Sequence, residues 1–127
     1  KKFIDNMLKL NISIPKSRIL IMGLTFKENC NDIRNSKVFD IIDYLVNKKI
    51  KVDVYDPMLL DYLPSKKNNF NFISKIIFNS YDSILISVKH KKFQKMGDKN
   101  IRKYAKKNSI IFDIKNTFPK TKNFLKI

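Results

Sequence analysis

The sequence predicts an α/β fold: a Rossmann-like, doubly wound parallel sheet in three layers, formed by a single domain. Short continuous apolar runs, typical of strands buried on both faces, alternate with stretches whose apolar residues recur at helical spacing. The length of 127 residues suits one domain with one core. Because crossovers between parallel strands are right-handed, this order winds helices onto both faces of the sheet. Ligands of such sheets bind at the carboxyl ends of the strands, so functional residues are expected in the loops that follow the strands.

The first half of the domain is predicted to run strand, loop, helix and strand, at residues 18–23, 24–35, 37–48 and 51–56. Gly23 closes the first strand, and Pro57 ends the second. Asn35 or Ser36 is expected to cap the helix by accepting a hydrogen bond from one of its free N–H groups. The predicted core face of this helix consists of Val38, Ile41, Ile42 and Leu45.

The second half is predicted to add strands at residues 70–73, 83–88 and 109–114, and helices at residues 74–79, 91–96 and 98–107. Residues 59–71 show no clear periodicity and are expected to form a loop with one helical turn. Residues 1–10 carry an apolar stripe and are interpreted as the tail of a helix that leads in from a preceding domain. The predicted boundary separates this tail, residues 1–16, from a ligand-binding domain at residues 17–127.

The chain is strongly basic, with a formal net charge of +16. Such a charge raises the possibility of a non-enzymatic module that binds nucleic acid or another polyanion. The basic residues are 24 lysines and 3 arginines, beside 14 asparagines and 19 isoleucines. AT-rich codons encode lysine, asparagine and isoleucine, whereas base readers and phosphate clamps favour arginine. A solvated lysine surface is therefore the favoured interpretation, and we expect no specific binding of nucleic acid.

The residue counts exclude several other classes of protein. One cysteine and one histidine cannot form an internal disulfide framework, a cysteine-built zinc site or a histidine-rich metal site. No apolar run is long enough for a transmembrane helix, and no secretory signal is apparent. We therefore expect a cytoplasmic protein without a metal site or a membrane contact.

The loop after the first strand carries the strongest chemical signal. It spans residues 23–36 and opens the first helix, where free N–H groups favour a bound phosphate. Lys27 and Arg34 would add positive charge there. The loop lacks the pattern G-x-G-x-x-G and the P-loop pattern, so its residues alone leave open a solvated surface loop.

The same loop, Gly-Leu-Thr-Phe-Lys-Glu-Asn-Cys-Asn-Asp-Ile-Arg-Asn-Ser, resembles the C-terminal domain of the UDP-glucose/GDP-mannose dehydrogenase family. Within that family it most resembles the bacterial UDP-N-acetylhexosamine 6-dehydrogenases of capsule, Vi-antigen and O-antigen synthesis. Two later segments also resemble the family: Ser87–Phe93, with its His-x-x-Phe pattern, and Phe112–Asn116, with its Asp-x-Lys turn. The resemblance covers residues 17–119.

The resemblance implies a UDP-sugar-binding domain of an NAD-dependent nucleotide-sugar 6-dehydrogenase, which converts a 6-hydroxyl to a carboxylate in two steps. It places Phe26, Lys27 and Lys115 at the UDP-sugar and Arg34 at the NAD. NAD itself would be bound mainly by an N-terminal domain, because the glycine fingerprint of that domain is not in this sequence. The family's catalytic cysteine loop is also not in this sequence. We therefore expect no catalytic residue here, no activity from this chain alone, and a homodimer for the full-length enzyme.

Three further polar residues have a structural and a functional interpretation. Cys30 is interpreted as a loop packing residue and not a nucleophile, because no basic partner at a fixed spacing would lower its pKa. His90 is interpreted as a loop hydrogen-bonding residue and not a general base. Asp56 stands where a Rossmann fold has its ribose ligand, but Asp-Pro is more typical of a turn.

Overall fold

The computed structural model describes residues 16–25, 27–34, 36–60 and 69–126, and these form a five-stranded, wholly parallel sheet of strand order β3-β2-β1-β4-β5. The strands are β1 (Arg18–Met22), β2 (Lys51–Tyr55), β3 (Asn71–Phe72), β4 (Tyr81–Ile86) and β5 (Ala105–Asp113). The helices are α2 (Val38–Asn47), α3 (Lys91–Met96), α4 (Asp98–Arg102) and the single 3₁₀ turn η1 (Pro57–Leu59). The predicted fold class is confirmed.

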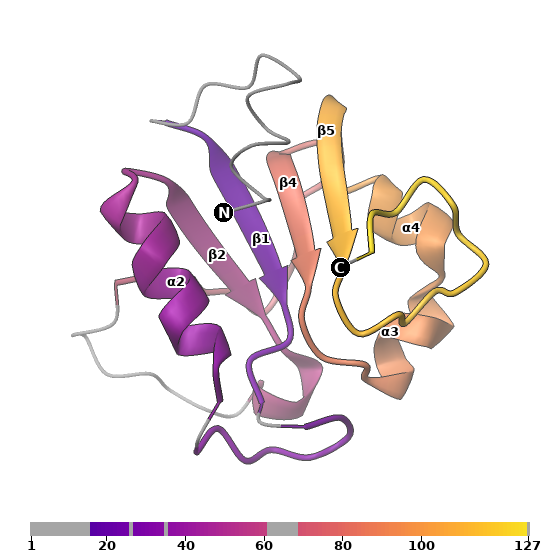
Figure 1. Ribbon diagram of the computed structural model, residues 1–127, viewed down its shortest axis with the longest axis horizontal. Coiled ribbons are helices and arrows are strands. Elements are labelled where there is room, and N and C mark those ends of the chain that lie inside the picture. The colour runs from indigo at the N-terminus through magenta and orange to yellow at the C-terminus, as the bar shows by residue number, and fades with distance from the viewer. Residues whose placement is uncertain (1–15, 26, 35, 61–68, 127) are drawn as a thin grey trace.

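Helices cover both faces of the sheet, which makes the three layers (Figure 1). On one face, Ile42 and Leu45 of α2 pack with Ile19 and Ile21 of β1. On the other face, Leu20 and Met22 of β1 pack with Phe93 of α3 and Ile101 of α4. Neighbouring β1 residues therefore point to opposite faces, and β1 is buried on both sides.

The order of the strands creates a switch point between β1 and β4. From β1 the chain winds through α2 to β2 and β3 on one side, whereas β4 and β5 lie on the other side of β1. The loops after β1 and β4 therefore leave the sheet in opposite directions, which opens a crevice at their carboxyl ends. All the labelled strands point toward this edge, the lower one in Figure 1.

Two predicted helices differ in the structure. Residues 98–107 form a helix only as far as Arg102, and β5 already begins at Ala105, which pairs with Tyr81 of β4. Pairing with a buried strand overrides the helical pattern of this lysine-rich segment. Residues 74–79 form bends and a turn and no helix. The N–H groups of Asn79 and Ser80 donate to the carbonyls of residues 103 and 104, and Phe78 stacks on Tyr104.

The predicted strands are present, but the bounds of three of them differ at both ends: β3 is shorter than the predicted 70–73, β4 begins and ends two residues before the predicted 83–88, and β5 begins four residues before and ends one residue before the predicted 109–114. α2 lies within the predicted range. Ser36 Oγ accepts a hydrogen bond from Val38 N at 3.3 Å, as predicted, but Lys37 and not Ser36 occupies the N-cap position.

The 3₁₀ turn η1 (Pro57–Leu59) shares only Leu59 with the range predicted to hold one helical turn, and most of that range lies outside the described residues, so the predicted turn stays a prediction. The predicted helical tail at residues 1–10, the alternative cap Asn35 and the candidate residue Phe26 lie outside the described residues. No helix in the described ranges is long and apolar enough to cross a membrane.

A polar cluster around the buried Asp53 carboxylate joins the four strands β1, β2, β3 and β4. The Tyr81 hydroxyl donates to Asp53 Oδ2 at 2.6 Å, and the same carboxylate accepts hydrogen bonds from Arg18 at 3.0 Å and Asn71 at 3.2 Å. Burial, together with this hydrogen bond, raises the pKa of Tyr81 above the ordinary value of a tyrosine.

Tyr81 is expected to make folding sensitive to alkali. Because its pKa is raised in the folded state, its contribution to stability is complete below the unfolded pKa of about 10 and is lost as pH rises above it. The loss is up to about 1.4 kcal/mol per pH unit above pH 10. Denaturant unfolding at pH 8 to 11.5 measures it, with Tyr81→Phe as the comparison. Parallel curves for the wild type and Tyr81→Phe would contradict this prediction.

Candidate functional site

The loop after β1, residues 23–30 and here called the Lys27 loop, is attached to the end of β2 by a buried carboxylate. Asp56 Oδ2 accepts hydrogen bonds from Leu24 N at 2.7 Å and Thr25 N at 3.2 Å, and Asp56 Oδ1 accepts from Met58 N at 2.9 Å. The carboxylate is fully buried and turned toward the protein backbone. Asp56 therefore caps the η1 turn and holds the Lys27 loop, and the ribose-ligand interpretation does not fit this geometry.

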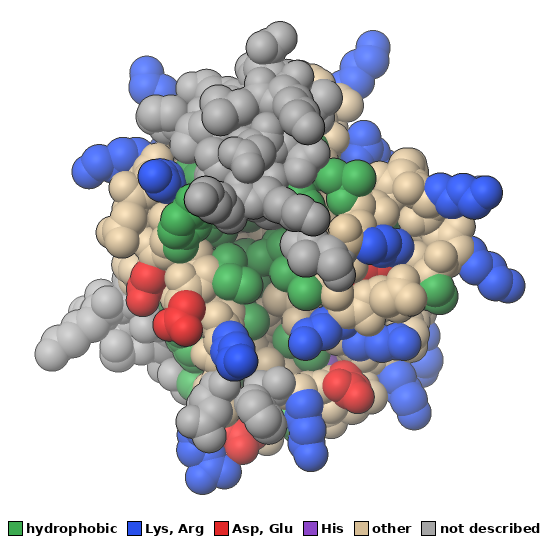
Figure 2. All heavy atoms as spheres, viewed as in Figure 1, with side chains coloured by type: hydrophobic (Ala, Val, Ile, Leu, Met, Phe, Trp, Pro, Cys, Tyr) green, Lys and Arg blue, Asp and Glu red, His purple; other side chains and the backbone are tan. Residues whose placement is uncertain are grey.

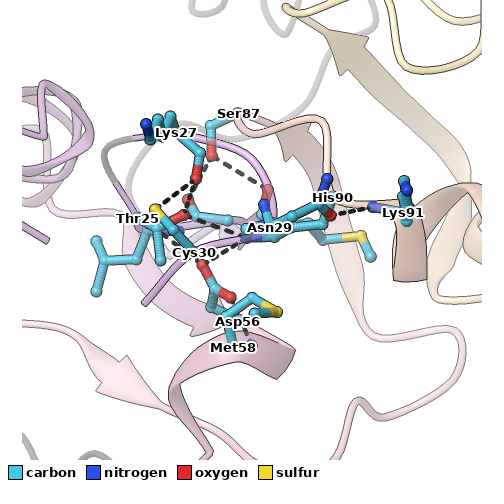
Figure 3. Close-up of polar contacts among 12 residues, drawn as sticks. Thr25, Lys27, Asn29, Cys30, Asp56, Met58, Ser87, His90 and Lys91 are labelled. Atoms are coloured by element: carbon cyan, nitrogen blue, oxygen red, sulfur yellow. Dashed lines mark hydrogen bonds and ion pairs between the residues drawn. The ribbon is translucent and has the colours of Figure 1, made fainter. Parts of the chain in front are cut away.

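His90, in the loop after β4, holds the same segment from the other side (Figure 3). Its Nδ1 accepts a hydrogen bond from Asn29 N at 2.9 Å, and its Nε2 lies 3.1 Å from Asp56 Oδ2 and 3.3 Å from Thr25 Oγ1. A backbone N–H can only donate, so Nδ1 carries no proton and Nε2 carries the hydrogen. His90 is fully buried. The predicted role as a loop hydrogen-bonding residue is confirmed.

Lys27 is exposed, and its carbonyl is held by two side chains of the same loop. The Lys27 carbonyl accepts hydrogen bonds from Thr25 Oγ1 at 2.8 Å and Cys30 Sγ at 3.2 Å. The Lys27 side chain is exposed. Cys30 is half-buried, and its contact with this carbonyl agrees with the predicted packing role.

The ends of β1 and β4 approach each other closely at Gly23. Gly23 has φ +109°, and a Cβ atom there would lie 2.7 Å from Val88 Cβ and 2.9 Å from Val88 N. Ser87 Oγ lies 3.1 Å from the Met22 carbonyl oxygen and 2.5 Å from the Gly23 carbonyl oxygen. These contacts form the floor of the crevice at the switch point.

Two adjoining pockets lie over this floor and share Ser87 and Lys115. The larger has a volume of about 380 Å³ and is lined by Thr25, Ser36, Lys37, Val38, Ile41, Ser87, Ile114 and Lys115. The smaller has a volume of about 290 Å³ and is lined by Lys27, Glu28, Ser87, Val88, Lys89 and Lys115. The first pocket combines an apolar wall with the N-terminal end of α2, whereas three lysines surround the second. This combination suits a ligand with an apolar ring and an anionic group.

Lys115 reaches these pockets on a turn organised by Asp113. The Asp113 carboxylate is fully buried and accepts hydrogen bonds from Thr117 N at 2.7 Å, Phe118 N at 2.8 Å and Lys126 Nζ at 2.7 Å. The backbone turns at residue 116, where φ is +56°. The fold thus brings Lys27 and Lys115 to the rim of one pocket, although they are far apart in the sequence.

Arg34 lies outside both pockets. Its guanidinium is exposed and makes two hydrogen bonds to the Asp32 carboxylate, each of 3.0 Å. These bonds hold the pKa of Asp32 below its usual range. Arg34 thus does not line the pocket that Lys27 and Lys115 share, and its side chain is exposed.

Several pocket residues were missed in the sequence. Lys89 follows the strand predicted at residues 83–88, so the rule for parallel sheets was the signal that could have found it. Ser87 was placed inside that predicted strand, whereas β4 ends at Ile86 and leaves Ser87 in the loop. Lys37 and Glu28 carried no signal that separates them from other surface residues. The described part of the chain holds no group of three or more histidine, cysteine or acidic side chains placed to bind a metal ion.

A profile of the UDP-glucose/GDP-mannose dehydrogenase family, UDP binding domain, matches residues 20–120. The chain belongs to this family. The match confirms the resemblance inferred from the Lys27 loop, and with it the prediction of a UDP-binding domain of the nucleotide-sugar dehydrogenases.

The chain is similar to curated relatives over nearly its whole length. It is 36% identical over 126 residues to the UDP-N-acetyl-D-glucosamine 6-dehydrogenase of Pseudomonas aeruginosa, covering 99% of this chain and 30% of the relative. It is 34% identical to the enzyme of the same name from Salmonella typhi, covering 94% of this chain and 28% of the relative. The chain therefore spans less than a third of the length of these relatives.

Two solved structures share the fold at lower identity. The UDP-N-acetyl-mannosamine dehydrogenase Cap5O from Staphylococcus aureus superposes with a TM-score of 0.68 at 26% identity, covering 98% of this chain and 28% of that one. The UDP-D-ManNAc dehydrogenase from Pyrococcus horikoshii gives a TM-score of 0.72 at 24% identity, covering 97% of this chain and 28% of that one, and supports the fold assignment.

Proposed function

We propose that this chain is the UDP-sugar-binding C-terminal domain of an NAD-dependent nucleotide-sugar 6-dehydrogenase of polysaccharide biosynthesis, and that Phe26, Lys27 and Lys115 bind the UDP-sugar. The observation that carries the proposal is the meeting of Lys27 and Lys115 at one pocket over the switch point. The names of the curated relatives support it.

The chemistry of the pockets suits a nucleoside diphosphate. Lysine ammonium groups make charge-assisted hydrogen bonds to phosphate oxygens, and the N-terminal end of α2 adds positive potential. The apolar wall of the larger pocket, formed by Val38, Ile41 and Ile114, offers a surface for a planar base. Phe26 lies outside the described residues, so its part in this proposal rests on the sequence pattern.

NAD does not fit the usual dinucleotide position of this Rossmann-like sheet. The loop after β1 has one glycine in place of a glycine fingerprint. The Asp56 carboxylate, which would bind the ribose in such a fold, is already hydrogen-bonded to backbone N–H groups and to His90. We therefore assign NAD mainly to another domain of the full-length enzyme, with the exposed Arg34 reaching it across the domain cleft. In this arrangement the chain binds and orients substrate and holds no catalytic residue.

The full-length protein is proposed to be a cytoplasmic homodimer that oxidises the 6-hydroxyl of a UDP-sugar to a carboxylate in two steps. Residues 1–16 would lead in from the preceding domain, and residues 17–127 would form the UDP-sugar domain. We expect no NAD reduction when this chain alone is mixed with a UDP-hexosamine, because its role is binding.

Polyanion binding is the second candidate function, suggested by the charge of +16. Figure 2 shows lysine and arginine side chains spread around the visible face and not gathered in one patch. Binding of oligonucleotides is therefore expected to be weak, indifferent to sequence and steeply lost with added salt, with a log–log slope of about 0.9 per phosphate contact.

Titration of UDP into the isotope-labelled chain tests the proposal. The wild type is expected to show saturable NMR shifts centred on Thr25, Lys27 and Lys115, with a dissociation constant of about a millimolar, since part of the cleft lies outside this chain. Lys27→Ala and Lys115→Ala are each expected to weaken binding by about tenfold or more, which removes saturation from the millimolar range. Lys107→Ala, an exposed lysine at the opposite edge of the sheet, is the matched control.

Two results would overturn the proposal. One is UDP binding that is unaffected by either pocket substitution. The other is sequence-specific oligonucleotide binding that survives physiological salt while UDP causes no shift in the Lys27 loop.

A further inference from the structure

We propose that His90 is a positioning residue of the UDP site, and that its unprotonated Nδ1 sets the conformation of the loop that presents Lys27. The proposal rests on the proposed function, because it concerns how the UDP-binding lysine is held. His90 itself is buried and lines neither pocket, so it acts on the ligand only through the loop.

The imidazole ring contacts the chain on both sides of Lys27. On the near side, Nε2 lies 3.3 Å from Thr25 Oγ1, and that hydroxyl donates to the Lys27 carbonyl at 2.8 Å. On the far side, Nδ1 accepts from Asn29 N at 2.9 Å. The residue that carries the ammonium group is therefore bracketed by two contacts to one ring (Figure 3).

The two ring nitrogens of His90 contact different parts of the Lys27 loop. Nε2 shares its hydrogen between Thr25 Oγ1 and Asp56 Oδ2, and Asp56 also holds the loop through Leu24 N and Thr25 N. Loss of the Nε2 contact therefore leaves the near side of the loop attached to Asp56.

Among the described residues, His90 Nδ1 is the one acceptor of the Asn29 N–H on the far side of the loop. Asn29 has φ +59°, a left-handed conformation that a non-glycine residue adopts at some cost. Its N–H is directed at Nδ1, and its side-chain Oδ1 accepts from Lys91 N at 2.9 Å. Without the Nδ1 acceptor, the Asn29 N–H would be left without this partner, and the turn after Lys27 would lose the contact that favours its conformation.

A purely structural role would need only the shape of the ring. The ring packs against Phe93 of α3 at 5.2 Å between centroids, edge to face. If packing were its whole contribution, substitutions of His90 would affect UDP binding only as far as they destabilise the fold. The proposal instead predicts that UDP affinity follows the acceptor at the Nδ1 position.

Two substitutions separate the nitrogens. His90→Asn places an amide oxygen near the Nδ1 position and removes the Nε2 contact. His90→Gln places its amide near the Nε2 position and removes the Nδ1 acceptor. Both substitutions replace the imidazole ring by an open-chain amide, so we expect them to destabilise the fold to a similar extent. Denaturant unfolding measures this loss of stability.

The expected result is a split between the two variants. His90→Asn should retain UDP binding within about threefold of the wild type, and the Asn29 amide resonance should stay close to its wild-type position. His90→Gln should lose tenfold or more in UDP affinity and shift the Asn29 amide. Equal UDP affinity in the two folded variants, or weaker binding in His90→Asn, would overturn the proposal.

A measurement on the wild type keeps the proposal testable if the variants do not fold. Long-range ¹⁵N–¹H NMR should show the hydrogen on Nε2, and a scalar coupling should connect Asn29 N to His90 Nδ1 across the hydrogen bond. A hydrogen found on Nδ1, or no coupling in an otherwise assigned spectrum, would overturn the proposal. These NMR signals do not depend on a ligand. A wild-type chain that fails to bind UDP would therefore contradict the proposed function, whereas the coupling between Asn29 N and His90 Nδ1 would still test the loop geometry.

Discussion

Replacing Gly23 with alanine is expected to lower the free energy of unfolding by about 2–5 kcal/mol, through about 1–3 kcal/mol of overpacking and about 1–2 kcal/mol of backbone strain. The added Cβ would lie within 2.9 Å of three atoms of Val88, one of which is a backbone nitrogen. Neither strand end can retreat easily, because Gly23 N donates to Tyr55 O and Ser87 N donates to Met22 O. The same substitution should weaken UDP binding, since it separates the loops that carry Lys27 and Ser87.

Gly97→Ala is the matched control for Gly23→Ala. Gly97 also has a positive φ, +83°, but a Cβ there would meet no atom within 4 Å. Its expected cost is therefore the backbone strain alone, about 1–2 kcal/mol, with UDP binding unchanged. Denaturant unfolding and UDP titration of both variants measure the difference. Equal losses of stability would show that the contact with Val88 does not constrain the switch point.

The sequence predicts the central strands well because burial on both faces leaves a direct pattern. β1 and β4 each contain a buried apolar run, residues 19–22 and 84–86, that packs on both sides of the sheet. The prediction fails for the lysine-rich segment after Gly97 because the local pattern there does not report the pairing that decides its structure. Its local pattern favours a helix, and only pairing with β4, a contact distant in sequence, makes residues 105–107 part of a strand.

Some parts of the candidate site could be predicted from the sequence and others could not. Lys27 and Lys115 were predicted from a motif, and their place at one pocket follows from strand order, which the alternation of strands and helices predicts. The buried pairing of Asp56 with His90 was not predictable, because each residue alone has an ordinary structural interpretation. Only the fold shows that the two meet around the Lys27 loop, since they lie 34 residues apart.

Asp113→Asn is expected to lower the free energy of unfolding by about 2–4 kcal/mol while preserving the shape of the side chain. Both carboxylate oxygens accept from donors: Thr117 N bonds to Oδ1, and Phe118 N and Lys126 Nζ bond to Oδ2. An asparagine amide offers one oxygen, so its NH₂ group must face a donor on the other side. One buried N–H would then lose its partner, and Lys126 would face no compensating charge.

Asp113→Asn is expected to weaken UDP binding as well as to destabilise the fold, because the turn that Asp113 organises carries Lys115. UDP affinity of Asp113→Asn is therefore expected to fall toward that of Lys115→Ala, even under conditions in which the variant is fully folded. Asp43→Asn is the control, since Asp43 is exposed on α2 and its side chain accepts one hydrogen bond, from Asn69 at 2.9 Å. Denaturant unfolding and UDP-induced shifts at residue 115 give the two readouts. If Asp113→Asn loses stability but binds UDP like the wild type, then the position of Lys115 does not depend on this turn, and the contribution of Lys115 to the pocket must be explained without it.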